Sequence, residues 1–139
     1  MRKTIGILIG CILLCGLAMA AMLAEAPSNA TVTVTIIGKP APDGVDTPWF
    51  VLSKSLGETV SWTNATASDC RVIYTGPSPF DKNVITIPHG ATSDPKAPTN
   101  APGPSDEDKK HPERVYKHYK YSVVCDSGDV FDPGNGIRP

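Results

Sequence analysis

Apolar residues alternate with polar ones in several short segments, and turn-forming residues separate these segments. The segments are residues 31–37, 58–63, 70–74, 84–87 and 115–125. In the first of them, Val32, Val34 and Ile36 alternate with threonines, so that one face is apolar. Alternation with a period of two is typical of half-buried β-strands, and no segment shows the spacing of an amphipathic helix. The pattern therefore predicts an all-β fold, an antiparallel β-sandwich with Greek-key connections.

Residues 88–112 interrupt this pattern. The stretch contains six prolines and almost no large apolar residue. Such a composition buries too little apolar surface to offset the entropy lost on ordering. We therefore predict a long, exposed, proline-rich loop that is partly disordered. The 139-residue length supports one domain, which we place at residues 28–139.

The first residues have the composition of a secretory leader. Arg2 and Lys3 provide a basic start, residues 5–19 form an apolar run, and small residues follow. The run is shorter than the roughly 20 residues that a membrane-spanning helix needs. We therefore predict a signal peptide at residues 1–20, with cleavage after Ala20.

A lipoprotein signal is the alternative for the leader. Leu8-Ile9-Gly10-Cys11 matches a lipobox, although the apolar run continues well beyond Cys11. Either signal predicts a periplasmic or extracellular protein, which would be lipid-anchored through Cys11 in the second case. We expect contact with a membrane only through an uncleaved or lipidated leader.

The net charge and the missing motifs exclude some classes of function. The formal net charge is −1, and no cluster of lysines or arginines occurs, which argues against a nucleic-acid binder. The chain lacks the sequence motifs of serine hydrolases, zinc proteases and phosphate-binding loops. We therefore expect a protein that is not an enzyme.

Several motifs occur in an order that resembles the cupredoxin-like family. After the opening strand, residues 57–64 read Gly-Glu-Thr-Val-Ser-Trp-Thr-Asn, and residues 119–123 read Tyr-Lys-Tyr-Ser-Val. Pro79-Phe80 is similar to a loop element of that family, and Asp132-Pro133-Gly134 is similar to the ending of many bacterial metal-free members. The resemblance implies a cupredoxin-like β-sandwich.

The ligands of a blue-copper site are where the chain departs from this family. Cys125 matches the copper-binding cysteine, and Cys70 lies near the place of the first histidine, but no histidine or methionine follows Cys125. A type 1 site needs two imidazoles and a thiolate. The resemblance thus implies a metal-free member without a cofactor. The alternative is a degenerate copper site built from Cys125, Cys70, His89 and His118, with His111 as a further candidate ligand.

Cleavage of the leader would leave Cys70 and Cys125 as the only cysteines of the chain. Both are in phase with apolar residues of their predicted strands, so both thiols are expected to point between the sheets. Two cysteines of an exported protein usually pair. A disulfide would close a loop of about 56 residues, for which the chain-entropy model gives roughly 4 kcal/mol of stability. A thiolate metal site is the alternative; a redox-active pair would lack the Cys-x-x-Cys spacing.

Two further features have both a structural and a functional interpretation. Asp126, Asp129 and Asp132 follow one another at three-residue intervals near a glycine, as oxygen ligands of calcium could, although such turns are common in β-proteins. Trp49 follows a proline in a predicted loop, where it could contact a ligand.

Together these features predict an exported, non-catalytic, cupredoxin-like binding or structural module of the cell envelope, without type 1 copper. Its partner would be an envelope protein or ligand that the sequence does not identify. The alternative is a periplasmic copper-binding or electron-transfer protein with a degenerate site.

Overall fold

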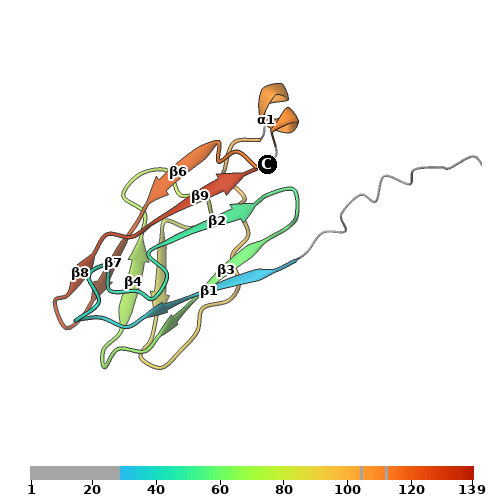
Figure 1. Cartoon of the computed structure of the whole chain (residues 1–139). Coiled ribbons are helices and arrows are strands. Elements are labelled where there is room, and N and C mark those ends of the chain that lie inside the picture. Colours follow the sequence, from blue (N-terminus) through green and yellow to red (C-terminus); the bar gives the residue numbers. More distant parts are fainter. Residues whose placement is uncertain (1–28, 104, 112) are drawn as a thin grey trace, which may run out of the picture.

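The computed structural model describes residues 29–103, 105–111 and 113–139, which form three β-sheets around one core (Figure 1). The predicted signal peptide with its cleavage site after Ala20, and the lipobox cysteine Cys11, lie outside the described residues. In order along the chain, the strands are β1 (Thr31–Ile36), β2 (Trp49–Ser53), β3 (Thr59–Asn64), β4 (Cys70–Ile73), β5 (Val84–Ile87), β6 (Lys117–Lys120), β7 (Ser122–Cys125), β8 (Val130–Phe131) and β9 (Gly134–Arg138). One short helix, α1 (Asp106–Lys110), precedes β6.

The predicted β-sandwich is confirmed, but its sheets are mixed rather than purely antiparallel. The sheet orders are β1-β3, β2-β9-β6 and β5-β4-β7-β8, and the pairs β1–β3 and β2–β9 run parallel. Parallel pairing needs a long crossover. Residues 37–58 provide one between β1 and β3, because they leave to form β2 in another sheet and then return. Among the described residues, no helix is long and apolar enough to cross a bilayer.

The single strand predicted over residues 115–125 is wrong, because the structure divides it into β6 and β7. β6 pairs with β9, whereas β7 pairs with β4 and β8 in a different sheet. Tyr121 lies between the two strands and is buried. The chain therefore passes from one sheet to another at this tyrosine while the alternation of side chains continues.

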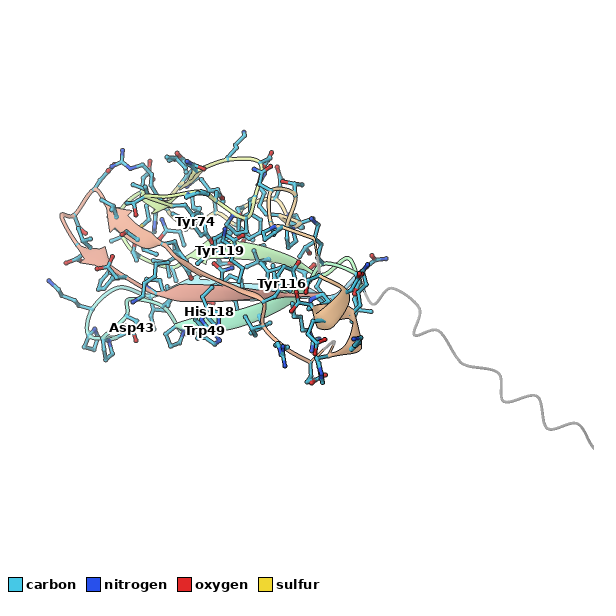
Figure 2. All side chains as sticks on the ribbon, turned by 90° about the horizontal axis from the view of Figure 1, so that it is seen from above. Asp43, Trp49, Tyr74, Tyr116, His118 and Tyr119 are labelled. Atoms are coloured by element: carbon cyan, nitrogen blue, oxygen red, sulfur yellow. A yellow bond between two sulfur atoms is a disulfide. The ribbon has the colours of Figure 1, made fainter. Side chains whose placement is uncertain are left out.

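Strands β2 and β9 are absent from the prediction, and Trp49 explains why β9 forms. A Cβ atom at Gly134 would lie 3.0 Å from the indole ring of Trp49, and one at Gly136 would lie 3.1 Å from it. The indole therefore reaches across β9 toward His118 of β6, with 5.3 Å between the ring centroids (Figure 2). A glycine-rich strand is weak alone but is stabilised when an aromatic side chain covers it. Trp49 was predicted in a loop; it lies in β2 and covers this strand.

The described residues of the proline-rich segment 88–112 are largely exposed, as predicted, but part of the segment is hydrogen-bonded to β3. Thr92 pairs with Thr63, and Lys96 pairs with Val60, so that this segment continues the β1–β3 sheet. The end of the segment forms α1, which Ser105 caps in a capping box. Few large apolar residues are needed here, because backbone hydrogen bonds to β3 fix the segment.

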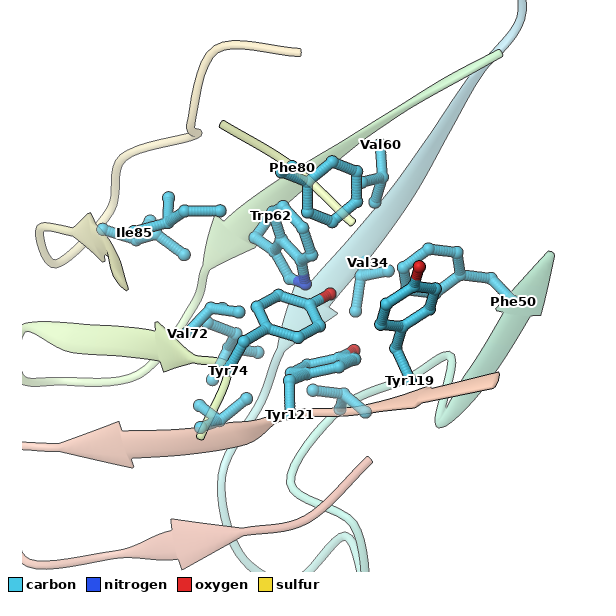
Figure 3. Close-up of a cluster of buried hydrophobic side chains, with 14 of the residues drawn as sticks. Val34, Phe50, Val60, Trp62, Val72, Tyr74, Phe80, Ile85, Tyr119 and Tyr121 are labelled. Carbon is cyan, nitrogen blue, oxygen red and sulfur yellow. The ribbon is translucent and has the colours of Figure 1, made fainter. Parts of the chain in front are cut away.

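The core is centred on Trp62 of β3, which is fully buried. Its ring meets those of Phe80 (5.7 Å between centroids), Tyr121 (6.0 Å) and Phe50 (6.3 Å) at steep angles (Figure 3). Edge-to-face contacts of this kind add stability beyond the area that they bury. Trp62 lies in β3, Phe50 in β2, Phe80 in the loop after β4, and Tyr121 between β6 and β7. Contacts among these rings therefore join all three sheets.

The core also contains polar atoms, which differ in their hydrogen bonding. The Tyr74 hydroxyl donates to Asn135 Oδ1 at 2.9 Å. In contrast, neither Trp62 Nε1 nor the Tyr121 hydroxyl makes a well-formed hydrogen bond within the described residues, although the indole N–H interacts weakly with the Tyr121 oxygen. Burial raises the pKa of Tyr121 to about 12 and raises the pKa of Tyr74 well above 10.0, so both are neutral at physiological pH.

These differences predict different outcomes for two matched tyrosine substitutions. Tyr121→Phe removes a hydroxyl that makes no well-formed hydrogen bond and interacts only weakly with Trp62, so it should change the free energy of unfolding little. Tyr74→Phe leaves Asn135 Oδ1 buried without a donor and should cost about 1–3 kcal/mol. Urea unfolding of both oxidised proteins measures the difference. Equal losses would contradict this account of the core.

Candidate functional site

The two cysteines face each other at one end of the sandwich. Cys70 of β4 is the register partner of Cys125 of β7, and the structure joins them in a disulfide, with 4.0 Å between their Cα atoms. The next pair outward is hydrogen-bonded, because Asp126 N donates to Asp69 O. The cysteines thus occupy the non-hydrogen-bonded position of the ladder, where opposite residues are closest. The predicted disulfide is present, and both of its residues are buried.

Asn64, at the end of β3, organises the loop that leads to the disulfide. Its Nδ2 donates to Ser68 O at 2.8 Å and to Ile87 O at 2.9 Å, while its Oδ1 accepts from Thr66 N and Thr66 Oγ1. Both N–H groups of the buried side-chain amide and two acceptor positions of its oxygen are thereby hydrogen-bonded. Thr66 Oγ1 lies 3.3 Å from Cys70 Sγ. The amide therefore holds the 66–68 loop, the end of β5 and the disulfide together.

Two ion pairs border this end of the molecule, which we call the disulfide pole: residues 64–70, His89 and residues 125–129. Lys39 Nζ lies 2.8 Å from Asp129 Oδ1, and Arg71 Nη2 lies 2.6 Å from Asp126 Oδ1. The hydrogen bond from Lys39 holds the pKa of the Asp129 carboxyl below its usual range. Both pairs are exposed to solvent, so they contribute little to stability.

A shallow hollow of about 480 Å³ lies beside the disulfide pole. It is lined by Ile37, Gly38, Lys39, Ala65, Thr66, Ala67, Ser68, Ser127 and Asp129. Ile37 is 44% exposed and gives the hollow an apolar patch among hydroxyls. Such a lining can contact a partner through apolar surface and hydrogen bonds. Its Ser127 hydroxyl donates to Asp129 Oδ2 at 3.2 Å, and Lys39 binds the other oxygen of the same carboxylate.

The histidines of the alternative copper site lie in separate places. His89 is at the disulfide pole, where its Nδ1 contacts the Thr66 carbonyl oxygen. His118 lies in β6 against Trp49, and His111 lies at the end of α1 between two glutamates. The structure therefore brings only His89 near the disulfide. Within the described residues, no group of three or more histidine, cysteine or carboxylate side chains could hold a metal ion.

The three aspartates considered for calcium do not converge. Asp126 and Asp129 form the ion pairs described above, and Asp132 accepts a hydrogen bond from Ser122 Oγ at 2.7 Å. Each carboxylate thus has its own partner, which supports their interpretation as turn residues.

Asn64 is the residue of this site whose role the sequence analysis missed. It formed part of the family-like Val-Ser-Trp-Thr-Asn motif, but its four hydrogen bonds depend on β5 and on the 66–68 loop. The motif itself was the signal, since a polar residue that ends an apolar strand in phase with Trp62 is expected to be buried.

Comparison with known proteins gives similarities to solved structures alone. No protein-family model matches the chain, and no curated protein matches it. Among solved structures, the chain is similar to a copper(I) form of a methionine-to-alanine variant of amicyanin. The two chains are 17% identical, the match covers 83% of this chain and 88% of the other, and the TM-score is 0.48. We draw nothing about binding or activity from this similarity.

The disulfide leads to a prediction about stability. Replacing both Cys70 and Cys125 with alanine should lower the free energy of unfolding by a few kcal/mol, because the unfolded chain is no longer cross-linked. The β-rich circular dichroism spectrum should persist at low temperature. Chemical unfolding measures the loss, and a reductant should weaken the unsubstituted protein but not the double variant. Two titratable thiols in folded, air-oxidised protein would contradict the disulfide.

Proposed function

We propose that this protein is an exported, non-catalytic binding or structural module of the cell envelope that holds no type 1 copper. The observation that carries the proposal is the Cys70–Cys125 disulfide. By its motif, Cys125 stands where a copper-ligating cysteine would, yet its sulfur is bonded to Cys70. A type 1 site requires a thiolate and two imidazoles, and a disulfide sulfur supplies no thiolate.

The same bond supports the proposed compartment. Structural disulfides persist in oxidising surroundings such as the periplasm and the cell exterior. The predicted leader at residues 1–20 would deliver the chain there, and a buried disulfide would stabilise a small domain after export.

The chemistry of the disulfide pole supports a binding role over catalysis. A hydrolytic or transfer site needs a nucleophile, a base and a group that orients the base. Here the hydroxyl of Thr66 donates within its own loop, and the carboxylates of Asp126 and Asp129 are paired with cations. The hollow beside the pole presents Ile37 and hydroxyls, which suit contact with another molecule.

A copper titration tests the absence of a type 1 site. Adding Cu²⁺ to the oxidised protein should produce no intense visible band of thiolate-to-copper charge transfer. The same titration after reduction of the disulfide serves as the comparison, because it frees Cys125. A strong band in the oxidised protein would overturn the proposal and favour the degenerate copper site.

Analysis of the exported form tests the proposed compartment. Cleavage after Ala20 should give a protein that begins Ala21-Met22-Leu23, which N-terminal sequencing and intact mass determine. A diacylglyceryl adduct on Cys11 would instead place the protein on a lipid surface, and retention of an unprocessed chain in the cytoplasm would contradict export.

A further inference from the structure

A groove of about 420 Å³ opens along one side of the sandwich, away from the disulfide. One wall is β5 and the other is the 92–96 segment that continues the β1–β3 sheet. The lining residues are Lys82, Val84, Ile85, Thr86, Thr92, Ser93, Asp94 and Lys96. The groove thus lies where two sheets end beside each other.

The wall formed by β5 is a free sheet edge. Among the described strands, β5 is the outermost of its sheet and pairs only with β4. Tyr74 N donates to Asn83 O at 2.8 Å, so hydrogen-bonded pairs alternate from that point along the ladder. By this alternation Ile85 is bonded to β4, whereas the N–H and C=O groups of Val84 and Thr86 point away from β4, toward the groove.

The opposite wall also presents backbone that β3 does not use. Lys96 and Val60 exchange both backbone hydrogen bonds, and Ser93 N donates to Trp62 O. Asp94, between these two attachments, makes no hydrogen bond within the described part of the chain. Asp94 lines the groove, and its N–H has no competing partner there among the described residues.

The charges at the groove favour an anionic occupant. Within the described residues, neither Lys82 nor Lys96 forms an ion pair, and Asp94 is the single carboxylate of the lining. Val84, at the same edge, leaves 47% of its surface exposed. Lysines on an edge strand discourage unselective pairing with neutral or basic strands. They attract a strand that carries carboxylates.

We propose that an extended peptide segment bearing carboxylates binds in this groove as an added strand along β5. Its backbone would pair with Val84 and Thr86, and its acidic side chains would meet Lys82 and Lys96. This is recognition by strand addition, in which the backbone gives affinity and the side chains give selectivity. The inference rests on the proposed binding role and deepens it by naming the class of partner.

The free edge of β6 offers an internal comparison. Tyr121 N donates to Pro133 O, so by the register of β6 with β9 the N–H of His118 also points away from its sheet. That edge borders a smaller hollow of about 270 Å³ next to Thr75, Gly76 and Pro77. It lacks a second wall of sheet backbone and is expected not to bind the same segment.

The test uses the full exported protein, oxidised, and a short peptide of alternating valine and glutamate. Backbone amide NMR should show saturable shifts at Val84, Thr86 and Asp94. A peptide of alternating valine and lysine should cause none, because it repels the two lysines. Shifts centred on β6 or on the disulfide pole, or an absence of saturable shifts, would overturn the proposal.

Two variants separate the backbone contribution from the charge contribution. Thr86→Pro removes an outward N–H without removing a bond to β4 and should weaken peptide binding about fivefold to tenfold. Lys82→Glu combined with Lys96→Glu should weaken it at least as much, and it remains informative if the proline variant fails to fold. His118→Pro and Lys120→Glu on β6 are the matched controls and should bind as the parent does. Unchanged binding by the charge-reversed protein would overturn the inference.

The peptide-binding experiment and the copper titration test separate claims. Peptide binding without a copper band supports both proposals. A copper band with no peptide binding would remove the proposed function itself, whereas no band and no peptide binding would remove only the groove.

Discussion

Cys70 and Cys125 can bond because β4 and β7 place them opposite each other where the ladder brings two backbones closest. The bond joins residues that are 55 apart in the sequence, and these residues bracket β5, α1 and β6. The cross-link therefore restricts much of the unfolded chain. It also fixes the loops that carry Thr66 and Asp126, so the shape of the disulfide pole depends on it.

In the interior, the aromatic core holds the three sheets together. Trp62 contacts rings from three other parts of the chain, and this packing determines how the sheets face each other. Within the described residues, the core contains some polar atoms without a well-formed hydrogen bond, which is unusual for a buried region. Tyr74 and Asn135 satisfy part of this polarity, because their hydrogen bond crosses from the loop after β4 to β9. Stability at this point thus depends on a specific pair rather than on burial alone.

Period-two alternation was sufficient to locate β1, β3, β4 and β5, because each of these strands has one apolar face. It failed for β9, since Gly134 and Gly136 have no side chains to alternate and are covered by Trp49 from another strand. It also joined β6 to β7, because the alternation continues through Tyr121 while the pairing partner changes. The strand with which a segment pairs depends on the tertiary structure, so the local pattern of side chains does not reveal a change of pairing strand.

The candidate site was also only partly predictable from the sequence. The phases of the two cysteines, together with the predicted export, were enough to predict their pairing. The part played by Asn64 could not be predicted, because its acceptors lie in a loop and at the end of another strand. The groove at β5 could not be predicted either, because residues 92–96 were predicted to belong to a partly disordered loop. Only the hydrogen bonds of Lys96 and Ser93 to β3 place that segment opposite β5.

The disulfide pole and the groove differ in how their backbone groups are used, and the two proposals depend on this difference. At the pole, the Asn64 amide donates hydrogen bonds to the carbonyl oxygens of Ser68 and Ile87. The two cysteine sulfurs are bonded to each other, so neither is a thiolate that could bind a metal. Along β5, the outward backbone groups of Val84 and Thr86 have no strand partner in the described part of the chain, where Lys82 and Lys96 also have no carboxylate partner. A domain whose end is fixed covalently can keep such an edge open, because the cross-link rather than edge pairing maintains the fold. The stability supplied at the disulfide pole would thus permit the proposed recognition at the groove.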